Sequence, residues 1–326
     1  MKNMILFILI LMIAIFSLFY IVLTNPVNTS YDPDSKEKIP VDTTLLYQHV
    51  EKLITTSNYR NHENIEALNE AADYIITAFK ETGLTPYEQT YMANGRNYKN
   101  IIAGYGPSDA PVLVVGAHYD VCGNQDGADD NASGVAGLLE LARLLNTFKP
   151  TLPYRIELVA YTLEEPPYFR TSLMGSAVHA QKLTESQTTV LGMICLEMIG
   201  YYSDQKSSQD FPISFLKLFY PSTGNFITVV GKLGEGKMVK KVKRKMIEGA
   251  DIPVESITAP ASIPGIDFSD HQNYWKYNIP AVMITNTAFY RNKNYHMPTD
   301  TIDTLNFTKM AEVVKGVYKA ITEFQF

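Results

Sequence analysis

Cysteine is scarce in this chain of 326 residues, which contains only Cys122 and Cys195. Two cysteines are too few for the disulfide framework that holds many small exported domains together. Cys195 lies in the apolar run VLGMICLEMIG, where a cysteine usually serves as a small buried side chain. We therefore interpret both residues as thiols, and we expect the fold to depend on a hydrophobic core, which a chain of this length can bury.

Positive charge is also limited, because 28 lysines and arginines stand against 34 aspartates and glutamates, for a net charge of −6. This balance argues against a nucleic-acid-binding surface, so we expect no nucleic acid partner. The one basic cluster lies in the run GKMVKKVKRKMIEG at residues 236–249. Its apolar residues recur at helical spacing, which predicts an amphipathic helix with a solvated basic face.

Only one hydrophobic run is long enough to cross a bilayer. Residues 4–23 are uncharged and almost wholly apolar, and about 20 such residues suffice for a membrane-spanning helix. The run ends in VLTNPVNTS, which lacks the small-x-small site of a cleaved signal peptide. We predict a transmembrane anchor or uncleaved signal over residues 1–24, with the rest of the chain periplasmic or extracellular. Cleavage and secretion is the alternative.

Beyond this run, residues 25–40 are polar and contain prolines, as expected of a linker. No second linker and no internal repeat follow, so residues 41–326 are predicted to form a single domain. Strand patterns, such as VLVVGAH at 112–118, alternate there with helix patterns, such as ASGVAGLLELARLLNTF at 132–148. This alternation predicts an α/β fold with a central mixed, mostly parallel sheet flanked by helices on both faces.

Acidic and imidazole side chains gather where the predicted strands end. The loop GAHYDVCGNQDGADDNASG at 116–134 directly follows a buried strand, and its carboxylates would repel one another unless a positive charge lay among them. Three later runs end or continue in Glu164 and Glu165, in Glu197, and in His296. Since the carboxyl ends of strands in an open α/β sheet form the ligand crevice, these groups can meet there. Two imidazoles with several carboxylates suit zinc, and more than one ion, although a solvated acidic loop would explain any single motif.

The ordered motifs GAHYD, GADDNASG, LEE followed by GS, LEMIGYY, SDH and YHMPTD resemble those of the M28 metallopeptidases. This resemblance extends from about Leu45 to the C-terminus. It implies the fold of the zinc exopeptidases, of the phosphorylase/hydrolase-like kind, and a co-catalytic pair of Zn²⁺ ions. Other divalent metals are possible. It also implies hydrolysis of peptide bonds, most often removal of N-terminal residues from peptides or small proteins with a free N-terminus.

Carried over position by position, the resemblance makes His118 and Glu197 ligands of one metal, and Glu165 and His296 ligands of the second. It makes Asp129 the ligand that bridges both, often with a cis peptide bond between Asp129 and Asp130. The two remaining roles are those of Glu164, as general base, and Asp120, as the carboxylate that orients His118.

Substrate contacts are expected from residues around the mouth of the site: Tyr168, Phe169, His271 and Tyr290. Ser269, Asp270 and His271 are adjacent and cannot all face one another, and no GxSxG motif occurs, so a serine-hydrolase triad is not expected. Three alternatives stay open: a glutaminyl cyclase-like acyltransferase with a single zinc, a carboxypeptidase on the same fold, and a catalytically silent binding ectodomain. A carboxypeptidase would need a basic clamp, which Arg170 or Arg291 could supply.

Overall fold

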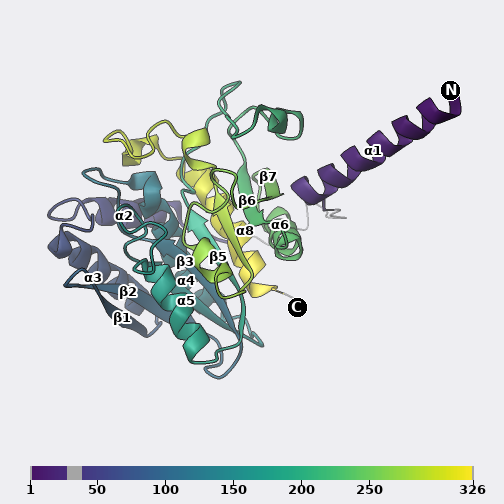
Figure 1. The fold of residues 1–326 in the computed structure, drawn as a ribbon. Coiled ribbons are helices and arrows are strands. Elements are labelled where there is room, and N and C mark those ends of the chain that lie inside the picture. Colours follow the sequence, from purple (N-terminus) through teal and green to yellow (C-terminus); the bar gives the residue numbers. More distant parts are fainter. Residues whose placement is uncertain (1, 28–38, 325–326) are drawn as a thin grey trace.

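A computed structural model describes residues 2–27 and 39–324, so most of the predicted linker at 25–40 lies outside the described residues. The centre of the molecule is one eight-stranded sheet (Figure 1). Its strands are β1 (Pro86–Ala93), β2 (Arg96–Tyr105), β3 (Val112–His118), β4 (Arg155–Tyr161), β5 (Val190–Glu197), β6 (Ile227–Lys232), β7 (Val254–Ala259) and β8 (Ala281–Thr285).

The strand order across the sheet is β1-β2-β4-β3-β5-β8-β6-β7. β3 lies between β4 and β5 and is parallel to both, and the pairs β5–β8 and β6–β7 are also parallel. The pairs β1–β2, β2–β4 and β6–β8 are antiparallel. The predicted mixed, mostly parallel sheet is therefore confirmed. β7 was not predicted, because its short sequence VESITA mixes apolar with polar residues, as an edge strand can.

Helices cover both faces of the sheet, which explains why every residue of β3 is buried. One buried cluster joins the sheet to α2 (Thr43–Ile54), α3 (Ile65–Glu81), α4 (Gly134–Phe148), α6 (Gly236–Gly249) and α8 (Phe307–Thr322). A second cluster on the opposite face includes residues of α5 (Gly175–Glu185) and α7 (His271–Trp275). Residues 236–249 are helical, as their apolar spacing predicts, with Met238, Val239 and Val242 in the first cluster.

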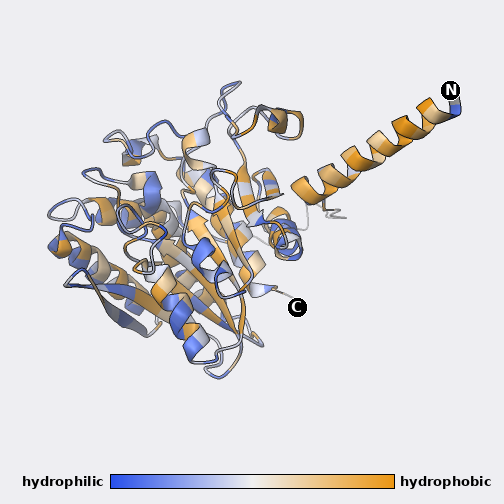
Figure 2. Ribbon diagram, viewed as in Figure 1, coloured by the Kyte–Doolittle hydropathy of each residue, from blue (hydrophilic) through white to orange (hydrophobic). Residues whose placement is uncertain are grey.

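The N-terminal helix α1 (Lys2–Thr24) projects away from this domain and is apolar along its length (Figures 1 and 2). Its span Asn3–Thr24 has a mean hydropathy of 3.1, and none of the most apolar part is buried. Length and composition therefore allow α1 to be either a membrane anchor or a signal peptide.

The C-terminal end of α1 is nevertheless bound to the domain. Asn25 is 2% exposed, and its side-chain amide donates a hydrogen bond of 2.6 Å to Thr258 Oγ1. The Thr24 carbonyl accepts from Ser256 Oγ at 2.7 Å and from Lys243 Nζ at 3.1 Å. These bonds satisfy polar groups at the end of the helix and bring positive charge to its negative pole.

Candidate metal centre

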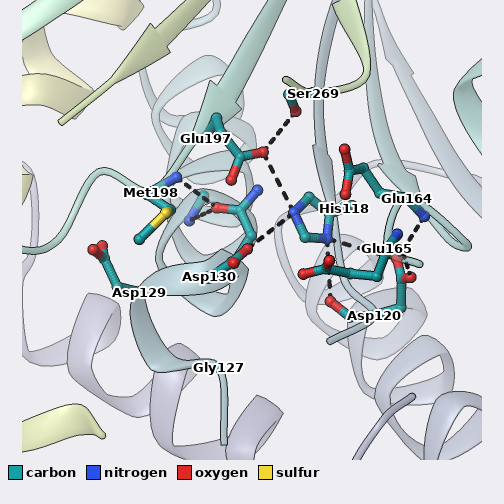
Figure 3. A network of polar contacts seen from close by, with 12 residues as sticks. His118, Asp120, Gly127, Asp129, Asp130, Glu164, Glu165, Glu197, Met198 and Ser269 are labelled. Atoms are coloured by element: carbon teal, nitrogen blue, oxygen red, sulfur yellow. Dashed lines mark hydrogen bonds and ion pairs between the residues drawn. The ribbon is translucent and has the colours of Figure 1, made fainter. Parts of the chain in front are cut away.

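One carboxylate, that of Asp130, lies between two imidazoles at the C-terminal edge of the sheet. Figure 3 shows its contact with the first of them, His118. His118, the last residue of β3, has its Nε2 atom 3.3 Å from Asp130 Oδ1 and 3.3 Å from Glu197 Oε2. His296 has its Nε2 atom 3.2 Å from Asp130 Oδ2 and 3.2 Å from Glu165 Oε2. Each imidazole therefore has a glutamate of its own, and the two share Asp130.

The prediction that Asp129 lies between the imidazoles is wrong, because this position belongs to Asp130. Figure 3 shows the Asp129 carboxylate pointing away from His118. Its oxygen atoms accept four hydrogen bonds of 2.8–3.2 Å, from the backbone nitrogens of Gly200 and Tyr201 and from the amides of Asn286 and Asn292, and a fifth of 3.3 Å from Ser133 Oγ. The cis peptide bond likewise joins Asp130 to Asn131, one residue later than expected.

Asp120 connects the end of β3 to the two glutamates that follow β4. Its carboxylate accepts hydrogen bonds from the backbone nitrogen of Glu164 at 3.1 Å and from that of Glu165 at 3.2 Å. The Nδ1 atom of His118 lies 3.1 Å from the backbone oxygen of Asp120 and 3.6 Å from its carboxylate. Nδ1–H donation to that backbone oxygen would leave the Nε2 lone pair facing Asp130 and Glu197.

The backbone adopts the left-handed conformation at three bulky residues of this site. Leu163, which precedes Glu164, has a φ of 60°, Met198, which follows Glu197, has 51°, and His296 has 55°. Residues other than glycine rarely adopt these angles, which cost free energy and persist where surrounding bonds impose them. Asn131 Oδ1, for example, accepts a hydrogen bond of 3.0 Å from the Met198 backbone nitrogen.

Two buried residues that the sequence did not single out hold the acidic loop in place. Asp300 accepts hydrogen bonds of 3.0 Å from the backbone nitrogens of both Asp129 and Asp130. Arg60 is 1% exposed and donates to the carbonyls of Tyr119 (2.8 Å), Gly127 (2.7 Å), Leu53 (3.2 Å) and Asp126. Asp300 belongs to the quoted motif YHMPTD, whereas no local pattern marks Arg60, which lies 59 residues before Tyr119.

Ser269 and Cys195 support Glu197, the last residue of β5. Ser269 Oγ donates a hydrogen bond of 2.6 Å to Glu197 Oε2, and the Cys195 thiol lies 3.2 Å from Ser269 Oγ. His271 faces another way and contacts the Ile266 carbonyl at 2.8 Å, so the adjacent Ser269, Asp270 and His271 form no serine-hydrolase triad. Both cysteines are free, as expected.

The buried carboxylates of the site favour binding of protons or cations among them. Burial raises the pKa of Glu164 well above its ordinary value and that of Glu165 to about 7. Burial alone would lower the pKa of His118, but Glu197, Asp120 and Asp130 outweigh burial and raise it well above its ordinary value. The pKa of His296 is raised in the same way by Asp130 and Glu165.

The residues present fit a divalent metal. Asp130 Oδ2, Glu165 Oε1 and His296 Nε2 are buried atoms that make no hydrogen bond, although Asp130 Oδ2 and His296 Nε2 lie 3.2 Å apart, and a bound cation would give all three a partner. Imidazole nitrogen with carboxylate oxygen is a common donor set for zinc. Cys122 adds a sulfur donor, since its Sγ and single donor atoms of Glu165 and His296 lie within 4.8 Å of one another.

A cavity of about 290 Å³ opens directly beside this cluster. Asp130, Glu164, Glu165, Glu197 and His296 line one end, and the remainder is mostly apolar and aromatic. Among the described residues that line it, none is a lysine or an arginine. The cavity therefore combines a negatively charged end with an apolar body.

Of the four residues expected at the mouth of the site, two line this cavity and two do not. Phe169 and Tyr290 line it, as expected. Tyr168 instead packs against Tyr98 and His62, with its ring centroid 6.1 Å from that of Tyr98 and 5.6 Å from that of His62. His271 is completely buried and packs edge-on against Trp275, with ring centroids 4.6 Å apart.

Comparison with known proteins agrees with this geometry. The model of peptidase family M28 matches residues 100–321, which is most of the chain. The chain is a member of peptidase family M28. The resemblance predicted from the ordered motifs is thereby confirmed. The chain, called the M28 peptidase from here on, is a hydrolytic enzyme, and its membership of this family implies that it binds zinc.

Among the relatives of the M28 peptidase, the uncharacterized protein YfbL of Escherichia coli K12 is 49% identical over 280 residues, covering 83% of this chain and 85% of YfbL. Leucine aminopeptidase 1 of Fusarium vanettenii is 25% identical over 294 residues, covering 85% of this chain and 69% of the relative.

Two solved structures with low sequence identity share the fold. LapB from Legionella pneumophila has a TM-score of 0.69 and 20% identity, covering 91% of this chain and 78% of LapB. Porphyromonas gingivalis glutaminyl cyclase has a TM-score of 0.67 and 18% identity, covering 87% of this chain and 99% of the cyclase.

Replacing Arg60 tests its role in holding the acidic loop. We expect Arg60→Met to lower the free energy of unfolding by about 3 kcal/mol or more, because each buried carbonyl left without a donor costs about 1–3 kcal/mol. Thermal melting of the full chain in detergent, with and without a chelator, measures this loss. The control is Arg96→Met, which replaces an exposed arginine and should change stability by less than about 0.5 kcal/mol. Equal melting of the two variants would contradict the role given to Arg60.

Proposed function

We propose that the M28 peptidase binds two zinc ions and removes N-terminal residues from peptides. His118 and Glu197 would hold one ion, His296 and Glu165 the other, and Asp130 both. The sharing of Asp130 between two imidazoles, each 3.2–3.3 Å from one of its oxygens, carries this proposal. A single zinc would not need two separate imidazole–glutamate pairs.

Glu164 would serve as the general base. When bound, a pair of zinc ions polarises a carbonyl group and lowers the pKa of water. Glu164 would accept the proton of the attacking water and transfer it to the amine that leaves when the peptide C–N bond breaks. Glu164 lines the cavity beside the proposed metal ligands, where a bound substrate would lie. Asp120 would fix the position of the base by binding its backbone nitrogen.

The charge of the cavity supports a substrate with a free amine rather than a free carboxylate. Its metal-facing end is lined by four carboxylates, and no lysine or arginine lines it among the described residues. Arg170, one of the two possible clamps, is paired with Asp267 at 2.6 Å. Arg291, the other, is 2% exposed and donates to the Phe226 carbonyl at 2.7 Å. A carboxypeptidase is therefore disfavoured.

The apolar body of the cavity supports removal of large hydrophobic residues. Phe169, Phe226, Phe268, Phe289 and Met283 are among the residues that line it. The aminopeptidase named in the comparison is a leucine aminopeptidase, which agrees with such a preference. A glutaminyl cyclase-like reaction with one zinc is the competing proposal, since a cyclase shares the fold.

Metal content and substrate selectivity test the proposed function together. We expect about two zinc ions per chain and cleavage of leucyl- and phenylalanyl-anilides, but no cleavage of the same compounds with an acetylated amine. Glu164→Gln should keep both ions and lose about 10²–10⁴-fold in kcat, because it removes the base and no ligand. One zinc per chain with cyclisation of N-terminal glutamine would establish the cyclase instead.

The two neighbouring aspartates make a matched pair of variants. Asp130→Asn should reduce the zinc content below two per chain, because it weakens the shared ligand. Asp129→Asn should keep both ions but lower the free energy of unfolding by about 2 kcal/mol, because an amide cannot accept all four hydrogen bonds. Metal analysis and thermal melting distinguish them, and the reverse pattern would restore Asp129 as the ligand.

We further propose that α1 is a retained membrane anchor and that the catalytic domain lies outside the cytoplasm. The bonds of Thr24 and Asn25 to Ser256, Lys243 and Thr258 support retention, because cleavage near residue 24 would leave their buried partners unsatisfied. Lys2 as the only charge before the apolar run supports this orientation.

Retention of the helix is measurable on the isolated protein. We expect the mature protein to resist alkaline extraction from membranes and to show the intact mass of 36.6 kDa. A soluble product with a new N-terminus near residue 25 would mean that the helix is a cleaved signal peptide.

A further inference from the structure

The aromatic stretch FPISFLKLFY at residues 211–220, called here the 211–220 segment, lies against α1. The ring of Phe219 lies 5.4 Å from that of Phe16 and 5.9 Å from that of Phe19, between centroids. The ring of Phe215 lies 5.9 Å from that of Phe19. Tyr20 also contacts Phe219, at 6.1 Å. The catalytic domain therefore contacts the side of the apolar helix as well as its end.

If α1 spans a bilayer, its length determines how deep these contacts lie in the hydrocarbon layer. A membrane-spanning helix needs at least about 17 apolar residues, and any such stretch within residues 4–23 includes 7–20. Phe16, Phe19 and Tyr20 therefore lie within the hydrocarbon layer wherever the span is placed. Phe215 and Phe219, which touch them, must lie at a similar depth.

The composition of the 211–220 segment suits that position. Leu218 is 69% exposed, Ile213 47% and Phe215 45%, which is unfavourable in water. Figure 2 shows apolar residues both on α1 and on the short helix η3 (Ser214–Leu218) within this segment. Lys217 is its single charged residue, and a long lysine side chain can reach the head groups from such a site.

Charge at the end of α1 agrees with a membrane surface there. The Thr24 carbonyl binds Lys243 of the basic helix α6, which places α6 beside the point where the chain leaves α1. Lys237 and Arg244 are exposed on α6, where they can meet the phosphate groups of lipids.

We propose that the 211–220 segment is immersed in the same bilayer that α1 spans, with lipid acyl chains covering Ile213, Phe215 and Leu218. The proposal rests on the retained anchor proposed above. The inner side of the segment lines the substrate cavity through Phe211, Pro212, Leu216 and Tyr220. The segment is thus a wall with lipid on one side and the cavity on the other, and the metal cluster acts on peptides present at the membrane surface.

Quenching of tryptophan fluorescence by brominated lipids tests this depth. Three variants of the full chain are compared: Leu218→Trp, Phe7→Trp and Met92→Trp. Each is reconstituted in phosphatidylcholine vesicles with and without bromine on the acyl chains. Trp275, the single native tryptophan, is 8% exposed and supplies the same background in all three. Phe7 lies within α1, and Met92, 67% exposed on β1, is the matched control outside the proposed contact.

We expect brominated lipid to remove most of the added emission of Leu218→Trp and Phe7→Trp, and none of that of Met92→Trp. Ile213→Trp, at a second exposed position, should behave as Leu218→Trp does. Quenching of Phe7→Trp without quenching of Leu218→Trp and Ile213→Trp would overturn this inference and leave the anchor standing. Absence of quenching at Phe7→Trp would overturn the anchor and the immersion together.

Discussion

The electrostatic cost of burying many carboxylates at one edge of a sheet is the constraint on which this structure depends. Asp130 lies 3.2–3.3 Å from two imidazoles, and Glu164, Glu165 and Glu197 are all at least nine-tenths buried around it. Like charges at these distances are tolerable only when cations or protons lie among them. The raised pKa values of the three glutamates and of both imidazoles are consequences of this one arrangement, which also suits the zinc chemistry of the family.

The surrounding framework keeps these side chains in position. Asp120 binds the backbone on either side of the base, Asp300 binds the loop that carries Asp130, and Arg60 bonds to four carbonyls around that loop. Parallel β3, β4 and β5 bring their C-terminal ends to one edge, so His118, Glu164 and Glu197, which are 33 or more positions apart in the chain, meet there. Hydrogen bonds hold the side chains at the metal-facing end of the cavity. The rest of the cavity is mostly apolar, so it would select a substrate mainly by shape.

The N-terminal helix, if retained as proposed, would link this catalytic architecture to the membrane. Bonds at Thr24 and Asn25 and the aromatic contacts of the 211–220 segment join α1 to the domain at two places. Because the same segment lines the substrate cavity, the proposed anchor would place the active site at a fixed position relative to the membrane. A flexible tether alone would not produce such a relation.

Much of this protein was determined by the sequence itself. Alternating strand and helix patterns were enough for a mixed, mostly parallel sheet, and the ordered motifs were enough for the family and for His118, Glu164, Glu165, Glu197 and His296 as the cluster. Only the tertiary structure decided which of Asp129 and Asp130 faces the imidazoles, since successive side chains of a loop point in directions set by backbone torsion and by distant partners such as Asn286 and Asp300. For the same reason, the sequence predicted neither the contacts of Arg60 nor the positions of Tyr168 and His271 outside the cavity. Helices, strands and family motifs can be predicted from local sequence, whereas the direction of a side chain depends on contacts between segments far apart in the chain.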